Sequence, residues 1–237
     1  IEIEGQVWEG VDVQFPWEPT ARRHHRRRMP MQPFHIDRHL VTNAQYKAFV
    51  DATGYAPRDA QHFLRDWRDG APQPGWENRP VTWVSIEDAR AYAAWAGTRL
   101  PHGWDWQYAA QGIDGRRYPW GNDWHDSFAP RVNRGRRLQP PADVDAHPQG
   151  ASPFGVEDLV GNVWQWCADY YNDDYRPAGK DPVDTQESDS RCVRGGSWNF
   201  GNPDYFRCAY RGGNDPVLRL SILGFRLSAG PQSEDTG

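Results

Sequence analysis

Apolar residues recur at helical spacing in the first half of the chain. In the stretch 42–53, Tyr46, Phe49 and Val50 fall at positions i, i+3 and i+4, which places them on one face of a helix. Thr42 or Asn43 can cap its N-terminus, and Gly54 can end it. The pattern predicts an amphipathic helix over 42–53.

Two further helices follow by the same reasoning. Ser85 with Asp88 forms a capping-box-like start, and Gly97 can end a helix over 85–97. A third, shorter helix is expected over 102–111. The apolar faces of these two helices are formed by Ile86, Ala89, Tyr92, Ala93 and Ala96 in one, and by Trp104, Tyr108 and Ala109 in the other.

Beyond residue 111 the helical period is lost, and recurrent Pro and Gly predict short, irregular strands and loops. The segment 217–223 (VLRLSIL) follows the turn signal 212–216 (GGNDP) and fits neither strand alternation nor a helical stripe. Apolar residues without a period are either buried irregularly or displayed for binding. This segment is therefore central to the function.

The composition predicts a fold with much irregular loop around an indole-rich core. The 237 residues include 13 Trp, 23 Gly and 20 Pro, a mixture that regular helical or sheet proteins do not need. We expect a lead-in over 1–33, one domain over 34–229 and a polar tail over 230–237. The indoles expected in the core are those of Trp83, Trp95, Trp120, Trp164, Trp166 and Trp198.

Charge and hydropathy exclude several classes of function. A net charge of −5 argues against general nucleic-acid binding, and no apolar run reaches the length of about 20 residues that spans a bilayer. The basic run 22–28 is interpreted as a solvated loop, with contact to phosphate or a membrane surface as the alternative. No signal peptide is visible, so a cytoplasmic location is the default expectation.

Candidate metal ligands are sparse. Three cysteines are too few for a disulfide framework, and none has zinc-finger spacing. His35 and His39 are four apart, but residues 34–37 are expected to form a strand rather than a helix. The carboxylate pairs 143/145 and 173/174 are interpreted as solvated turns, with calcium as the alternative.

Several motifs, in order along the chain, resemble the formylglycine-generating-enzyme (sulfatase-modifying-factor) family, a branch of the C-type lectin-like fold. The resemblance implies an α+β domain with two packed helices, small antiparallel sheets and much ordered loop. The motifs that carry it are 34–37, 41–46, 80–85, 93–101, 118–122, 158–166, 194–198 and 223–226.

The resemblance implies copper held by two cysteines shortly after the RGGS motif, but this chain has Phe200 and Tyr205 at those positions. Cys208 lies beyond them, and Cys192 is interpreted as a small buried hydrophobe on a strand. We therefore predict that the chain is not an enzyme. The resemblance also implies that iron-binding histidines belong to an additional helical domain, which 237 residues cannot contain. It leaves a structural calcium near Asp158 and Asn162 as the only cofactor considered.

The C-terminal stretch is also similar to the variable proteins of diversity-generating retroelements, in which adenines of AAC codons are randomised. The resulting NNC codons cannot encode Lys, Glu, Gln, Met or Trp, and residues 199–223 contain none of these five. This resemblance implies a non-enzymatic protein with a variable region over 199–223 that binds an unknown ligand, expected to be a protein. The predicted variable positions are Phe200, Gly201, Asp204, Tyr205, Gly212, Gly213, Asn214, Val217, Leu218, Leu220, Ser221 and Ile222.

Two alternatives remain open: a divergent metal-dependent enzyme that uses Cys192 or Cys208, and an undiversified accessory domain. In the accessory reading, Leu220 and Ile222 are ordinary core residues. Under each of these hypotheses, Asn162 is expected to form hydrogen bonds with the backbone of a loop. Glycines such as Gly224 are expected to allow close packing of the chain. The arginines expected to brace loops through carboxylates such as Asp158 or Asp169 are Arg194, Arg211 and Arg226.

Overall fold

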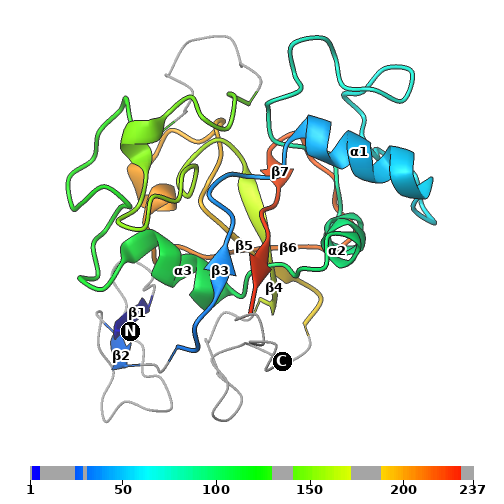
Figure 1. Ribbon diagram of the computed structural model, residues 1–237. Coiled ribbons are helices and arrows are strands. Elements are labelled where there is room, and N and C mark those ends of the chain that lie inside the picture. The colour runs from blue at the N-terminus through cyan, green and yellow to red at the C-terminus, as the bar shows by residue number, and fades with distance from the viewer. Residues whose placement is uncertain (1, 6–24, 29–30, 130–140, 172–187, 231–237) are drawn as a thin grey trace, which may run out of the picture.

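The computed structural model describes residues 2–5, 25–28, 31–129, 141–171 and 188–230. It shows an α+β fold of the C-type lectin-like type, with three helices, small sheets and long ordered loops (Figure 1). The helices α1 and α2 lie to one side of the central strands in Figure 1, and α3 lies to the other. The helices are α1 (Asn43–Thr53), α2 (Ile86–Trp95) and α3 (Gly103–Gln111), and two short 3₁₀ helices are η1 (Pro148–Gly150) and η2 (Pro203–Phe206).

The three predicted helices are confirmed, together with both predicted N-caps of α1 and α2 and the predicted C-cap of α1. Thr42 accepts from the N–H of Gln45 to start α1, and Gly54 ends it in the left-handed region at φ 65°. Ser85 and Asp88 form the expected capping box of α2. This helix ends at Trp95 with Ala96 as its C-cap, one residue before the predicted Gly97.

The largest sheet has the strand order β6-β5-β4-β7. The strands β4 and β5 are antiparallel with an irregularity after Trp166, whereas β4 and β7 are parallel. A second sheet pairs β3 with β8, and a third pairs β1 with β2. The strands are β1 (Glu2–Gly5), β2 (His25–Arg28), β3 (His35–Ile36), β4 (Trp164–Tyr170), β5 (Arg191–Arg194), β6 (Gly212–Asn214), β7 (Leu223–Gly224) and β8 (Ser228–Ala229).

The core lies between α1, α2 and the four-stranded sheet, and it is rich in aromatic rings. Trp166 is fully buried and donates from its indole N–H to the carbonyl of Val84, as expected for an indole among loops. Placing Trp95 in the core was wrong. It is the last residue of α2 and is 46% exposed, because the C-terminal end of this helix, residues 94–97, faces solvent.

Gly224 confirms the predicted role of glycine in close packing. A Cβ at this position would lie 2.6 Å from the carbonyl oxygen of Val81, so only glycine lets β7 approach that strand-like segment.

The arginines of the RGGS and GFR motifs brace loops, but not in the way expected. Arg226 is fully buried and donates to the carbonyls of Asp37, Arg38 and Glu157 and to the amide oxygen of Gln165, rather than to a carboxylate. Arg194 donates to the carbonyls of 208–210. Backbone carbonyls of irregular loops lack ladder partners, so buried guanidinium groups satisfy them.

The basic run 22–28 is only partly described. Its residues 25–28 form β2, paired antiparallel with β1, so for this part the prediction of a loop was wrong. Residues 22–24 lie outside the described part. In the residues that the structure describes, no helix is long and apolar enough to cross a membrane.

Candidate functional site

Aromatic side chains from the predicted variable region gather on Trp164 of β4. The ring centroid of Trp164 lies 5.6 Å from that of Phe200 and 5.9 Å from that of Tyr210. Tyr205, in η2, lies 4.9 Å from Phe200 and 5.1 Å from Tyr210. Each ring contacts two of the other three, and Phe200, Tyr205 and Tyr210 are half-buried, so these three rings present one aromatic surface above the buried Trp164. We call these four residues the aromatic cluster.

The aromatic cluster stands where the family resemblance places a pair of copper ligands. Phe200 and Tyr205 are in contact, so the fold does bring these two positions together. Neither side chain carries a thiolate, and a ring and a phenol are poor ligands for a soft metal. The residues present do not fit a copper ion of the kind that the resemblance implies.

The three cysteines lie elsewhere, fully buried in one cluster behind α3. The Cys167 thiol hydrogen-bonds to Cys192 across β4 and β5. This bond, with the charges of Arg211 and Arg194, lowers the pKa of Cys192 to about 6 although burial acts against it. Burial raises the pKa of Cys208 far above its ordinary value, so Cys208 does not suit the role of thiolate ligand.

The aperiodic segment after the GGNDP turn is only partly displayed. Val217 is 68% exposed and Leu218 is 37% exposed. Leu220 and Ile222 are half-buried and pack against the main core, where the carbonyl of Ile222 accepts from the N–H of Trp164. Arg219 points inward and is buried. The segment therefore begins with two displayed residues and continues with anchored ones.

The remaining predicted variable positions differ in the room around them. Gly201 is exposed, and a Cβ added to it would meet no atom within 4 Å, whereas a Cβ on Gly213 would lie 2.5 Å from the ring of Tyr171. Asp204, in η2, forms an ion pair with Arg117 at 2.9 Å. Gly212, Asn214 and Ser221 are half-buried.

At the position where calcium was expected, the buried carboxyl group of Asp158 accepts a hydrogen bond from the side-chain amide of Asn162. Asn162 donates to Asp158 at 3.3 Å and exchanges two hydrogen bonds with the backbone of Ala142, which confirms its predicted role on loop backbone. Burial raises the pKa of Asp158 to about 7. Within the described ranges no cluster of three or more His, Cys, Asp or Glu side chains could hold a metal ion. Residues 173 and 174 lie outside the described residues, and calcium stays a prediction.

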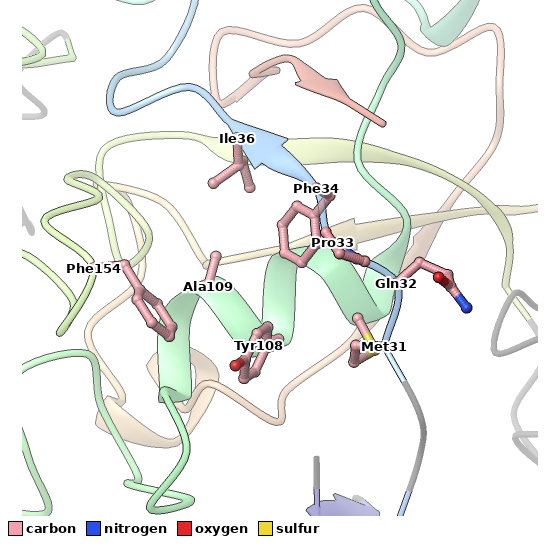
Figure 2. A pocket seen from close by; sticks show the side chains of 8 residues that line it. All are labelled: Met31, Gln32, Pro33, Phe34, Ile36, Tyr108, Ala109 and Phe154. Atoms are coloured by element: carbon pink, nitrogen blue, oxygen red, sulfur yellow. The ribbon is translucent and has the colours of Figure 1, made fainter. Parts of the chain in front are cut away.

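Sequence reasoning missed one concave feature, a pocket of about 440 Å³ beside α3 (Figure 2). The sequence analysis assigned Phe34 to a motif and Tyr108 to the inward face of the third helix. In the structure both side chains are half-buried and line this pocket. That these two residues line the same pocket could not be predicted, because they are 74 positions apart in the chain. The lining is Met31, Gln32, Pro33, Phe34, Ile36, Tyr108, Ala109 and Phe154.

The fold and the RGGS-to-GFR frame define a C-type lectin-like domain of the formylglycine-generating type. A family model described as "Sulfatase-modifying factor enzyme 1-like domain" matches residues 5–229. The chain belongs to this family.

Similar proteins include enzymes. The chain is 33% identical to the formylglycine-generating enzyme of Thermomonospora curvata, over 86% of this chain and 84% of that protein. It is 34% identical to the hercynine oxygenase of Mycolicibacterium smegmatis, over 82% of this chain and 52% of that protein. The prediction that the chain is not an enzyme is therefore corrected. It rested on a missing cysteine pair, whereas these relatives place the chain in an enzymatic family.

Among solved structures, Treponema denticola variable protein 1 superposes with a TM-score of 0.66, over 97% of this chain and 94% of that one. The two sequences are 22% identical, so the likeness establishes the shared fold.

Proposed function

We propose that this protein binds a polypeptide ligand on the aromatic cluster, and that the C-terminal region 199–223, which supplies three of its rings and also exposes Val217 and Leu218, is diversified. The observation that carries the proposal is the contact of Phe200 with Tyr205, 4.9 Å apart, at the positions where the family resemblance places metal-binding cysteines. Half-buried aromatic side chains, rigid and partly apolar, are the residues that supply most of the affinity at protein interfaces.

The scaffold beneath supports this use. Trp164 is buried in strand β4, and its indole ring packs against the rings of Phe200 and Tyr210. Val217 and Leu218, exposed in the same C-terminal region, stand on fixed backbone because the nearby Arg219 and Ile222 are anchored to the scaffold. Binding then costs little ordering of the protein itself, which favours affinity.

Peptide selection tests the proposal. Peptides are enriched from a displayed random library on the immobilised protein, and their Kd values are measured by calorimetry. The double variant Phe200→Ala/Tyr205→Ala should weaken binding about 30-fold, the loss that corresponds to roughly 2 kcal/mol at a hot spot. Ile113→Ser, which changes an exposed apolar residue outside this surface, is the matched control. Peptides that bind wild type and the double variant equally would contradict the proposal.

An enzymatic activity of the kind that the relatives' names describe is the second candidate. It is favoured by the paired thiols of Cys167 on β4 and Cys192 on β5, which lie together in the buried cysteine cluster, and by the enzymes among the relatives. Formation of formylglycine in a peptide, measured by mass spectrometry, tests this activity. Loss of product in Cys192→Ala, with peptide binding retained, would support it. No product from wild type would exclude it for that substrate.

A further inference from the structure

The pocket beside α3 is separate from the surface proposed above. We propose that it is a binding site for an uncharged aromatic small molecule that carries one or two hydrogen-bonding groups. Its volume of about 440 Å³ lies within the range of roughly 300–1,000 Å³ that small-molecule sites occupy. The segment 31–36, which includes β3, forms one wall, and the turn of α3 at Tyr108 and Ala109 forms the other (Figure 2).

The walls are shaped for a flat ring. Tyr108 lies between two further rings: the centroid of Phe34 is 6.2 Å away with an interplanar angle of 58°, and that of Phe154 is 5.4 Å away with an angle of 57°. Such inclined rings offer both faces and edges to a guest ring, the arrangement that aromatic pairs prefer. The short side chain of Ala109, drawn between these rings in Figure 2, leaves the space open.

The lining of the pocket carries no charged side chain, which favours an uncharged ligand. None of the eight lining side chains is ionised at neutral pH. An ionised ligand would lose its hydration here without gaining an opposite charge, which is costly. Two polar groups can orient a guest, the amide of Gln32 and the hydroxyl of Tyr108. The Tyr108 hydroxyl has no hydrogen-bond partner among the residues that the structure describes, so it is free to bond a ligand.

The pocket also exposes apolar surface that a ligand would cover. Phe154 is 52% exposed, and Met31 and Phe34 are half-exposed beside it. Contiguous exposed apolar side chains on a protein surface mark interaction sites. The space is about the size of one small molecule and is closed on two sides by backbone. A compact ring therefore fills it better than an extended polypeptide.

A matched pair of probes tests the inference. Anilinonaphthalene is neutral and fluoresces in apolar surroundings, and its sulfonate has the same rings with a fixed negative charge. Titration of the full chain with each probe should give a fluorescence increase and a Kd at least about tenfold lower for the neutral probe. Equal affinity for both probes, or no response to the neutral one, would overturn the proposal.

Variants locate the probe. Ala109→Phe should abolish the signal by filling the space, and Phe154→Ala should weaken binding about fivefold or more. Since Ala109 is buried, melting temperatures are measured for both variants, and the exposed Phe154 decides the outcome if Ala109→Phe fails to fold. Val217→Ser, on the other surface, should leave the probe's Kd unchanged. Binding that survives Phe154→Ala and disappears with Val217→Ser would place the probe on the C-terminal surface and overturn the proposal.

Discussion

Arg219 and Asp88 form a buried ion pair that ties the C-terminal segment to the first turn of α2. Nε of Arg219 donates to one carboxylate oxygen of Asp88 at 2.7 Å, and Nη2 donates to the other at 3.2 Å. The two side chains are 8% and 0% exposed. The same carboxylate accepts from the backbone N–H of Ser85 in the capping box. A residue in the middle of the predicted variable region is thus part of the scaffold.

Removing this arginine should destabilise the fold strongly. Arg219→Ala leaves the Asp88 carboxylate buried without its partner, and we expect a loss of about 3 kcal/mol in the free energy of unfolding. The control is Lys47→Ala, which removes an exposed i,i+4 ion pair with Asp51 and should cost less than about 0.5 kcal/mol. Urea denaturation measures both. Equal losses would show that the Arg219 pair contributes no more than a surface pair.

Two glycines within the predicted variable region should respond differently to the same change. A Cβ at Gly213 meets the Tyr171 ring at 2.5 Å, so Gly213→Ala must displace that ring and should cost roughly 1–3 kcal/mol. Gly201 has open space around it, and Gly201→Ala should be near neutral. Melting temperatures of the two variants decide the point. A stable Gly213→Ala protein would mean that this position tolerates diversity.

Local signals in the sequence predicted the local parts of the fold. The pairs Thr42–Gln45 and Ser85–Asp88 are three residues apart, so their capping boxes could be seen directly. The family motifs supplied the rest of the topology. What could not be predicted depends on long-range contacts. Asp88 and Arg219 are 131 positions apart, which hides their pairing, and the exposure of Trp95 depends on how much of the rest of the chain packs against the C-terminal end of α2.

The same limit applies to the candidate site. Phe200 and Tyr205 were expected on the surface from their positions in a motif, but the packing of Phe200 on Trp164 of β4 joins residues 36 positions apart and could not be seen in the sequence. The pocket beside α3 was missed because its two walls come from separate parts of the chain.

Ionisation of His102 should make stability depend on pH. Burial alone lowers the pKa of His102, but the hydrogen bond and charge of Asp169, 3.0 Å away, outweigh it and raise the pKa above the ordinary value. Because the pKa of His102 is higher in the folded state than in the unfolded state, protonation of His102 stabilises the fold. This stabilisation is fully present when the pH is below the ordinary pKa of about 6.5, and it is lost as the pH rises through the pKa of the folded state. Replacing His102 should therefore cost more at low pH than at high pH.

The measurement compares the free energy of unfolding of wild type and His102→Asn at about pH 5.5 and about pH 9. Because other groups titrate alike in both proteins, the difference isolates His102. If His102→Asn lowers the free energy of unfolding by the same amount at both pH values, the assigned ion pair with Asp169 is contradicted.

Metal removal should not unfold the protein. Asp158 is already hydrogen-bonded by Asn162, and in the part of the chain that the structure describes no group of three or more His, Cys, Asp or Glu side chains could hold an ion there, whereas calcium takes six to eight oxygen ligands. We expect the melting temperature to be unchanged by a chelator. A fall of several degrees that calcium reverses, and that Asp158→Asn removes, would instead establish a structural calcium at this position.

Sequencing the DNA downstream of the native gene's stop codon tests whether the C-terminal surface is a diversified binding surface. We expect a near-copy of codons 194–227 that differs only where the copy has adenine. We expect mismatches at displayed positions such as Gly201, Val217 and Leu218, and none at the anchoring Arg219 or at Gly224. Absence of such a copy, or mismatches concentrated at these anchored positions, would contradict diversification of this surface.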